Sequence, residues 1–216
     1  MTTDLTPVLY GAPLSPFTMR VYIQISAKGL DIPLEGPPGG LKSETFLSLN
    51  PIGKMPVLQA GDLSLPESEV IVDWLEEAYP ETPVYPSGAD AKARCRLIAR
   101  VADLYVMNAM LPLFGQLDPA TRDEAIVSRT LEDLNNGLMR LESFLAAGPY
   151  AYGDSLTAAD CAVAPFLLFV ERFAPAFGVA SPFAGLSNIK SYWPQIQKDP
   201  HVAKALDMMR AALDAL

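Results

Sequence analysis

The fold is decided by the stretch Tyr10-Gly-Ala-Pro-Leu-Ser15-Pro-Phe-Thr-Met-Arg20-Val. It follows the extended run Pro7-Val-Leu-Tyr10, and beyond it apolar residues recur every four positions, which is close to the period of a helix. Proline is favoured at the first helical position, so Pro16 places Ser15 at the N-cap. The stretch therefore predicts a strand, a tight turn and a helix that stops at Gly29.

The residues after this helix alternate between extended and helical segments. We expect an extended segment at 32–35, a short helix at 43–49, a hairpin of strands at 56–59 and 63–65, and a helix at 68–79. The order of elements is β-α-β-α-β-β-α. An α/β domain is therefore predicted over residues 1–80.

The rest of the chain has a different composition. Four residues that break helices and strands, Pro80, Pro83, Pro86 and Gly88, predict a linker over 81–89. Beyond it no strand pattern recurs, and helical spacing covers 90–114, 120–147, 157–172 and 190–215. We therefore expect an all-helical domain over 90–216, which makes the fold class α/β plus all-α.

Composition excludes several classes of function. The net charge is −9 and the basic residues are scattered, so nucleic acid is not an expected partner. The longest apolar run, Cys161 to Val170, is about half of a membrane span, and a polar N-terminus lacks the pattern of a secretory signal. The single histidine, His201, excludes a multi-histidine metal site. Cys95 and Cys161 lie in apolar stretches and are expected to be reduced core thiols, which favours a cytoplasmic protein.

A second informative segment is Gly53-Lys-Met-Pro56-Val-Leu, which places a proline at the entrance of a strand expected inside the sheet. A proline tolerated there is often cis, held in a turn that exposes the neighbouring backbone. The N–H and C=O of Val57 would then be free to pair with an extended peptide. The alternative is an edge-strand proline without a ligand.

The third segment is Leu65-Pro-Glu67-Ser68-Glu, in which Ser68 is expected to cap the following helix. The N-terminus of a helix attracts anions, so a ligand carboxylate could bind at Ser68 while Glu67 receives an ammonium group. The head of an amino acid carries both charges. The alternative is a plain capping motif.

These motifs, in this order and spacing, resemble those of the soluble glutathione S-transferases. The resemblance rests on Ser15-Pro-Phe-x-x-Arg-Val, Asn50-Pro-x-Gly-Lys-x-Pro56-Val-Leu, Pro66-Glu-Ser68 and Gly153-Asp-Ser-Leu-Thr-Ala-Ala-Asp160, and covers nearly the whole chain. It implies a thioredoxin-like first domain, a helical second domain, a homodimer, and glutathione as co-substrate with no metal. The Ser-Pro-Phe form is nearest to the tau class, with phi and zeta-like bacterial members also similar.

The resemblance also implies roles for individual residues. Ser15 would donate a hydrogen bond to the glutathione sulfur and hold it as a thiolate, with Tyr10 and then Thr18 as the next candidates. The cysteinyl backbone of glutathione would pair at Val57, beside Met55 and Pro56. Glu67 and Ser68 would hold the γ-glutamyl head. Lys42 and Lys54 would take the glycine carboxylate, unless they are only solvated surface lysines.

The helical half offers a candidate pocket for a hydrophobic electrophile. Its residues would be Leu14, beside Ser15, together with Tyr105, Met110, Phe114 and Phe166, although such apolar stripes usually form plain core. By contrast, Thr157 and Asp160 form a capping box at a helix start, which assigns Asp160 a structural role.

The expected function is therefore a glutathione transferase of the detoxifying kind, in which Ser15 stabilises the thiolate that attacks a hydrophobic electrophile. A helix N-terminus and one donated hydrogen bond lower a thiol pKa from its usual value of about 8.5. Two alternatives stay open: a glutathione-dependent lyase, etherase, dehalogenase or cis-trans isomerase with the same glutathione site, and a non-catalytic binding protein of the same fold.

Overall fold

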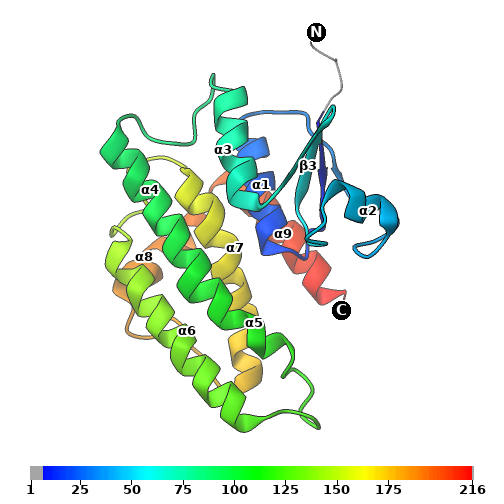
Figure 1. Cartoon of the computed structure of the whole chain (residues 1–216). Helices are drawn as coiled ribbons and strands as arrows, with labels where there is room; N and C mark the ends of the chain where they lie inside the picture. Colours follow the sequence, from blue (N-terminus) through cyan, green and yellow to red (C-terminus); the bar gives the residue numbers. More distant parts are fainter. Residues whose placement is uncertain (1–6, 216) are drawn as a thin grey trace. The chain divides into compact units, whose positions relative to one another are not determined.

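A computed structural model describes residues 7–215 of the chain (Figure 1). The described chain forms two compact units: the first holds residues 7–84 together with 200–215, and the second holds Tyr85–Asp199. The predicted fold class, a thioredoxin-like α/β part and a helical part, is confirmed. The compact units differ from the predicted domain division because the last helix belongs to the first unit and not to the helical one.

The first unit is built on a four-stranded sheet with the order β2-β1-β3-β4. Its strands are β1 (Val8–Tyr10), β2 (Leu34–Glu35), β3 (Val57–Ala60) and β4 (Leu63–Pro66). β1 runs parallel to β2 and antiparallel to β3, and β4 is antiparallel to β3. Leu9 and Leu58 lie opposite each other on the two central strands and are fully buried. β3 is therefore internal, as the sequence predicted.

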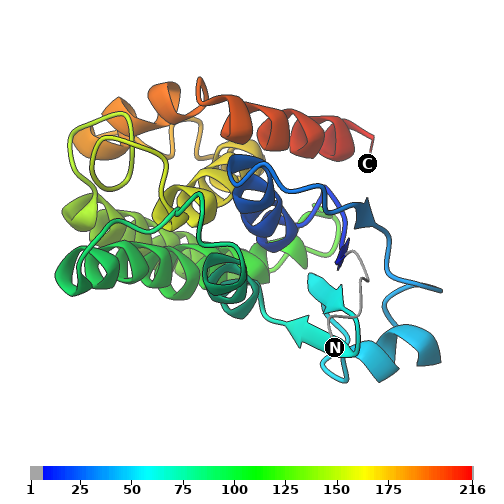
Figure 2. The same cartoon turned by 90° about the horizontal axis from the view of Figure 1, so that it is seen from above.

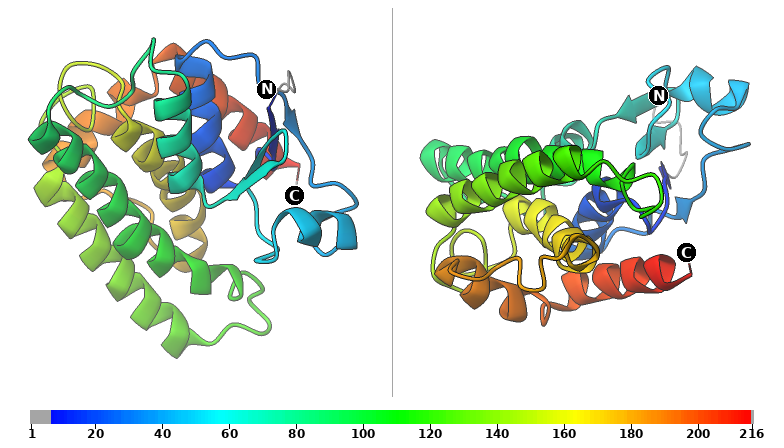
Figure 3. Two further views of the ribbon diagram at one scale, coloured as in Figure 1. Left: turned by 45° about the horizontal axis from the view of Figure 1, so that its top comes forward. Right: turned by 90° about the horizontal axis from the view of Figure 1, so that it is seen from below.

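Four helices complete the first unit: α1 (Pro16–Ala27), α2 (Glu44–Leu49), α3 (Ser68–Ala78) and α9 (Pro200–Asp214). α1 and α3 pack together on one face of the sheet, and α2 lies on the other (Figures 1 and 3). α9 packs along α1, as Figure 2 shows, although 172 residues of sequence lie between Ala27 and Pro200. The Ser26 hydroxyl and His201 Nδ1, 3.0 Å apart, join these two helices.

Lys28 ends α1 and holds the chain that follows α3, an arrangement that we call the Lys28 clamp. Its ammonium lies 2.7 Å from Glu76 Oε2 and donates hydrogen bonds of 2.9 Å to the carbonyls of Tyr79 and Thr82. Glu76 Oε2 also accepts a bond of 3.1 Å from the N–H of Val84. The three acceptors match the three protons of the ammonium group. The clamp therefore fixes the proline-rich segment 79–84 to α1 and α3.

The second unit is entirely helical in the residues that the structure describes. Its elements are α4 (Ala89–Val101), η1 (Ala102–Met107), α5 (Asn108–Phe114), α6 (Glu124–Phe144), α7 (Ala158–Phe173), η2 (Ala174–Phe177) and α8 (Ser187–Ile196). α7 is the central helix, since every residue from Ala158 to Val170 is buried, and α4, η1 and α8 pack against it. The expected helix over 190–215 is instead two helices, the end of α8 and the whole of α9.

The helix from Ala89 to Phe114 is continuous but changes its winding at η1, which is a π-helix. There it packs against α6 at Gly137, where a Cβ atom would overlap the carbonyl group of Tyr105. A residue without a side chain is thus required where the two backbones approach. The same helix is long and apolar enough to cross a membrane, yet half of its most apolar window is buried in the protein. Its packing against α6 and α7 identifies it as a core helix.

The start of α7 confirms the predicted capping box of Thr157 and Asp160. Asp160 Oδ2 accepts bonds of 2.8 Å from both the N–H and the hydroxyl of Thr157, and Oδ1 accepts one of 2.7 Å from Ala151 N–H. Burial raises the pKa of this carboxyl group to about 6, although the hydrogen bonds from Ala151 and Thr157 favour the charged form. Asp160 is therefore a folding residue, as expected.

α6 and α8 cap each other across 46 residues of sequence. Glu142 Oε1 accepts a bond of 2.7 Å from Asn188 N–H, and Oε2 accepts one of 2.9 Å from Ile189 N–H at the start of α8. In return, Asn188 Nδ2 donates to the carbonyls of Glu142 and Leu145 at the end of α6, at 3.1 and 3.0 Å. One side chain from each helix thus satisfies the open end of the other.

Candidate active site

The N-terminal tip of α1 carries Ser15 as predicted. Ser15 is the N-cap, Pro16 is the first helical residue, and Ser15 Oγ accepts a bond of 3.3 Å from Thr18 N–H. The side chain is half-buried, and the first turn of α1 holds no acidic residue. The positive end of the helix dipole is therefore not compensated from within the helix and favours an anion beside Ser15.

A tight turn connects β1 to this helix tip. Gly11 N–H bonds to the carbonyl of Glu35 at 2.8 Å, and Ser15 N–H bonds to that of Ala12 at 3.0 Å. Gly11 lies against the side chain of Thr18, whose hydroxyl would be 2.6 Å from a Cβ at this position. Leu14, within the turn, is half-buried. Thr18 itself is fully buried, so its hydroxyl does not face the surface where Ser15 lies partly open.

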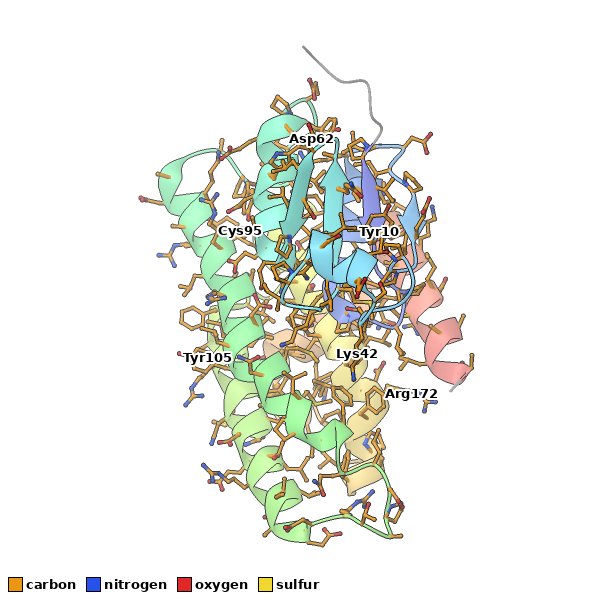
Figure 4. The ribbon with its side chains drawn as sticks, turned by 45° about the vertical axis from the view of Figure 1, so that its right-hand side comes forward. Tyr10, Lys42, Asp62, Cys95, Tyr105 and Arg172 are labelled. Atoms are coloured by element: carbon orange, nitrogen blue, oxygen red, sulfur yellow. The ribbon has the colours of Figure 1, made fainter. Side chains whose placement is uncertain are left out.

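Tyr10, the second candidate hydroxyl, lies on β1 within the sheet (Figure 4). It is half-buried and stands opposite Glu35 on β2 and Val57 on β3. Unlike Ser15, it is not at a helix N-terminus. The dipole that favours an anion is thus available at Ser15 and not at Tyr10.

The peptide bond between Met55 and Pro56 is cis, as predicted. The preceding loop is shaped by Asn50, which is buried and whose Nδ2 donates to the carbonyl of Lys54 at 2.6 Å while Oδ1 accepts from Ile52 N–H at 2.9 Å. Gly53 supplies the positive φ of 68° that this loop requires. The Asn-Pro-x-Gly-Lys-x-Pro motif therefore encodes one rigid turn that ends at the cis bond.

The expectation that the backbone of Val57 stays free is contradicted by the sheet. Val57 stands opposite Tyr10 on one side and Pro66 on the other, so a strand already flanks it on both sides. Met55 precedes β3 and lies outside this register. Val57 therefore offers no open strand edge to an extended peptide.

Glu67 and Ser68 sit where β4 meets α3, but their places differ from the prediction by one residue. Glu67 is the N-cap and Ser68 the first helical residue. Glu67 has φ 69° and ψ 111°, and it is the one residue other than glycine with positive φ in the described part of the chain. Such a conformation is costly and is typical of functional sites. The side chain of Glu67 is exposed, whereas Ser68 is buried.

Arg20 contacts the candidate site in a way that the sequence did not reveal. It lies on α1, is only 3% exposed, and its Nη1 donates a bond of 3.2 Å to Ser68 Oγ. Because a guanidinium donates only, Ser68 accepts here and keeps its own hydrogen for another group. A charged residue between the apolar neighbours Met19 and Val21 was the available signal, but its partner lies 48 residues away.

The register of the sheet brings these groups to one end of it. Tyr10, Val57 and Pro66 stand side by side across β1, β3 and β4. Consequently the turn that leads to Ser15, the cis bond before Val57 and the junction at Glu67 all leave the sheet at the same end. A helix N-terminus follows both the first and the third of these segments.

Two lysines lie in the loops that come before the cis bond in the sequence. Lys42 lies in the loop before α2 (Figure 4), and Lys54 lies in the turn before the cis bond. Both are exposed. Their ammonium groups are thus open to an anion as well as to solvent.

The four residues of the second unit that were expected to line an electrophile pocket differ in their exposure. Met110 and Phe166 are fully buried, which contradicts their assignment, because an enclosed side chain offers a ligand no surface. Tyr105 is 43% exposed, and the guanidinium of Arg140 lies 4.9 Å from the centre of its ring. Phe114 is half-buried and makes edge-on contacts with Phe169 and Phe173, at 5.8 and 5.1 Å between ring centres. Only Phe114 belongs to a partly open aromatic group.

The remaining titratable groups do not suggest another centre. Over residues 7–215 no three His, Cys, Asp or Glu side chains are grouped to hold a metal ion. Cys95 and Cys161 form no disulfide and are buried, as expected. Burial raises the pKa of the Cys95 thiol to about 11, so this thiol is protonated and unreactive at neutral pH.

Comparison with known proteins relates the chain to one family. Residues 9–83 match the family model described as "Glutathione S-transferase, N-terminal domain", and residues 101–200 match "Glutathione S-transferase, C-terminal domain". Glutathione S-transferase 3 of Zea mays is 32% identical over 210 residues, which cover 92% of each chain. A stringent starvation protein A homolog of Coxiella burnetii is 30% identical over 85% of this chain and 83% of its own. Maleylpyruvate isomerase of a Ralstonia species is 31% identical over 76% and 82%.

Solved structures agree with these matches. Glutathione transferase F7 of Populus trichocarpa superposes with a TM-score of 0.79 at 28% identity, covering 94% of this chain and 99% of that one. A glutathione S-transferase of Methylobacterium radiotolerans, in complex with glutathione sulfonate, has a TM-score of 0.77 at 25% identity and covers 92% and 93%. Both likenesses extend over nearly the whole of each chain.

Proposed function

Because the chain belongs to the glutathione S-transferase family, we propose that it binds glutathione at the sheet end described above and activates it as a thiolate through Ser15. The observation that carries the proposal is the common register of Tyr10, Val57 and Pro66, from which Ser15, Met55 and Glu67 all follow. The three segments supply a dipole for an anion, an open stretch of backbone and a charged head site. These features suit the thiolate, the cysteinyl backbone and the γ-glutamyl head of glutathione, respectively.

The γ-glutamyl head is assigned to the junction of β4 and α3. The N-terminus of α3 and the hydroxyl of Ser68 suit its carboxylate, and the exposed carboxylate of Glu67 suits its ammonium group. Arg20 supports this assignment, since its bond to Ser68 Oγ leaves the hydroxyl hydrogen of Ser68 available for the ligand. The glycine carboxylate at the other end of the tripeptide is assigned to Lys42 and Lys54.

The cysteinyl residue of glutathione is assigned to Met55. The cis bond to Pro56 turns the chain just before β3, and the N–H and C=O of Met55 lie outside the sheet register. An extended peptide adds to such a backbone through paired hydrogen bonds. This pairing would direct the cysteinyl side chain along the same sheet end, toward the helix tip at Ser15.

The chemistry is assigned to Ser15. Its hydroxyl donates a hydrogen bond to the sulfur, while its oxygen accepts the N–H of Thr18, and the uncompensated end of α1 favours negative charge beside it. Both effects lower the thiol pKa and raise the fraction of thiolate, which is the nucleophile. A serine forms no mixed disulfide with glutathione, so the proposal is attack on an electrophile and not thiol exchange. The aromatic group of Phe114, Phe169 and Phe173 is the candidate surface for a hydrophobic acceptor.

Two features of the relatives favour other functions of the same site. The match to maleylpyruvate isomerase supports a glutathione-dependent isomerase, in which the tripeptide is regenerated. The match to stringent starvation protein A homologs, whose names specify no glutathione reaction, supports a non-catalytic binding protein. Lyase, etherase and dehalogenase chemistry would use the same glutathione residues.

We also propose that the protein is a cytoplasmic homodimer. Leu97, Leu104 and Leu111 recur at intervals of seven along the helix from Ala89 to Phe114, and each is at least 40% exposed. A row of exposed leucines on one helix is a surface that a second copy would cover. Sedimentation of wild type and of Leu104→Glu tests this, because a monomer in both, or a dimer in both, contradicts the assigned face.

The transferase proposal is tested with Ser15→Ala. Conjugation of glutathione to a generic aromatic electrophile should fall at least about ten-fold, as expected for the loss of a hydrogen bond that stabilises a developing or fixed anion. Asp123→Ala is the matched control, since Asp123 caps α6 through bonds to Ala125 and Ile126 N–H and has no part in the site. It should lose stability but keep its rate.

Retention on immobilised glutathione separates the alternatives. A transferase or an isomerase should be retained and eluted by free glutathione, and the consumption of glutathione during turnover distinguishes the first from the second. Retention without conversion of any acceptor supports the binding protein. If wild type is not retained on immobilised glutathione, the assignment of the whole site is refuted.

A further inference from the structure

The hydroxyl of Thr18 has no evident structural purpose in the ligand-free protein. Thr18 is fully buried, and its Oγ1 forms no hydrogen bond with any residue in the described part of the chain. A buried hydroxyl without a partner is destabilising. Valine would fill the same volume without that cost, so packing alone does not account for threonine at this position.

The residue is nevertheless joined to both ends of the turn that holds Ser15. Its N–H donates to Ser15 Oγ at 3.3 Å, which connects it to the helix tip. Its methyl and hydroxyl groups lie against Gly11, the residue that follows β1, where any Cβ would overlap them. The position of Thr18 is thus set by the strand on one side and by Ser15 on the other.

The hydrogen-bonding capacity of Ser15 suggests what the hydroxyl is for. A serine hydroxyl has one hydrogen to donate and two lone pairs that accept. When its hydrogen points to an anion, the N–H of Thr18 fills one lone pair and the other stays open. A threonine in a helix adopts either of two side-chain rotamers, so its hydroxyl can turn while its backbone stays in place.

We propose that Thr18 is a positioning residue for Ser15: with glutathione bound, the Thr18 hydroxyl donates a hydrogen bond to Ser15 Oγ. Ser15 then accepts two bonds from one residue and its single hydrogen is directed at the sulfur. Donors on an oxygen strengthen that oxygen's own hydrogen as a donor, so the thiolate is held more firmly. This inference rests on the proposed function, because it requires Ser15 to face the sulfur.

The test compares Thr18→Ser with Thr18→Ala, since both variants lose the methyl group and they differ only in the hydroxyl. Titration of the thiolate absorbance of bound glutathione should give the wild-type pKa for Thr18→Ser and a higher pKa for Thr18→Ala. At a pH below the wild-type pKa, kcat should fall roughly 3- to 10-fold in Thr18→Ala, the range that one hydrogen bond supplies. KM for glutathione should not change, because the head and glycine contacts are intact.

Thr18→Val adds a readout of stability. It keeps the shape and removes the unpartnered hydroxyl, so we expect a thermal midpoint equal to or above that of wild type together with the raised thiol pKa of Thr18→Ala. If Thr18 has a purely structural role, the thiol pKa of bound glutathione should be unchanged in every variant that folds. That result overturns the inference, as does a raised pKa in Thr18→Ser.

Ser15→Ala separates this inference from the function on which it rests. A raised thiol pKa in Ser15→Ala with a wild-type pKa in Thr18→Ala and Thr18→Val sinks the role of Thr18 alone. An unshifted pKa in Ser15→Ala sinks both. A raised pKa in Ser15→Ala, Thr18→Ala and Thr18→Val, with Thr18→Ser unchanged, supports both.

Discussion

Replacing Lys28 with methionine should lower the free energy of unfolding of the first unit by more than the loss of a single charge suggests. The side chain of Lys28 is 1% exposed and that of Glu76 is 13%, so their ion pair of 2.7 Å is shielded from water. Lys28→Met removes the ammonium from the Glu76 carboxylate and from the carbonyls of Tyr79 and Thr82 at once. Breaking a buried pair in this way costs about 3–5 kcal/mol.

The matched control is a surface ion pair of the same unit. Arg210 and Asp207 lie 3.1 Å apart on α9, with side chains 38% and 75% exposed. Arg210→Met should therefore cost less than about 1 kcal/mol. Removing both members of the buried pair, in Lys28→Met with Glu76→Leu, should cost less than Lys28→Met alone because no buried charge remains.

The assay is urea unfolding followed by the fluorescence of Trp74, which lies on α3 of the first unit. The second tryptophan, Trp193, lies on α8, so a Trp193→Phe background reports the first unit alone. For a chain of this size the expected loss corresponds to roughly 6–20 °C in the thermal midpoint. The reasoning is refuted if Lys28→Met costs no more than Arg210→Met, or if the double variant is the less stable one.

Three further predictions concern the second unit. Cys95 and Cys161 should resist thiol reagents in the native protein and react only in denaturant, because both are buried and burial raises the pKa of Cys95 to about 11; rapid labelling of native protein would contradict this. The pKa of Asp160 is raised from its usual value of 3.8 to about 6 in the fold, so the folded state binds the proton more tightly than the unfolded state. The stability of wild type relative to Asp160→Asn, measured by urea unfolding at each pH, should therefore decline as pH rises from about 4 to about 6. An increase in the relative stability of wild type over this range would exclude the shift. Glu142→Ala should lower the free energy of unfolding by about 1–2 kcal/mol through loss of the cap on α8, measured in urea, with Glu142→Gln intermediate; equal losses in the two variants would show that the charge, and not the cap, matters.

Features set by neighbouring residues could be predicted from the sequence. The N-cap at Ser15, the cis bond before Pro56 and the capping box of Thr157 and Asp160 all depend on residues within a few positions of one another. Local chemistry decides such features, because Pro16 fixes its own φ and a capping side chain reaches only two or three residues ahead. They were sufficient to identify the fold class and the segments of the candidate site.

Features that depend on the register of the sheet or on partners distant in sequence could not be predicted from the sequence. The sequence placed the peptide-pairing backbone at Val57 because nothing local tells that Tyr10 and Pro66 flank it. Arg20 was overlooked because its partner, Ser68, lies on another helix. The apolar pattern of α5 and α7 likewise does not tell the buried Met110 and Phe166 from the half-open Phe114, since all three have helical spacing.

The π-helix of η1 limits how this chain tolerates insertions and deletions. A π-helix forms its hydrogen bonds over five residues where an α-helix uses four, so η1 accommodates an extra residue, and loss of one residue between Ala102 and Met107 would return this segment to α-helical winding. The helix after η1 would keep its orientation, with Phe114 still beside Phe169 and Phe173, while the backbone that now meets Gly137 would be replaced by another. Homologues without this extra residue are therefore expected to keep the aromatic grouping at the end of the helix but to differ where α6 approaches it, at the position of Gly137.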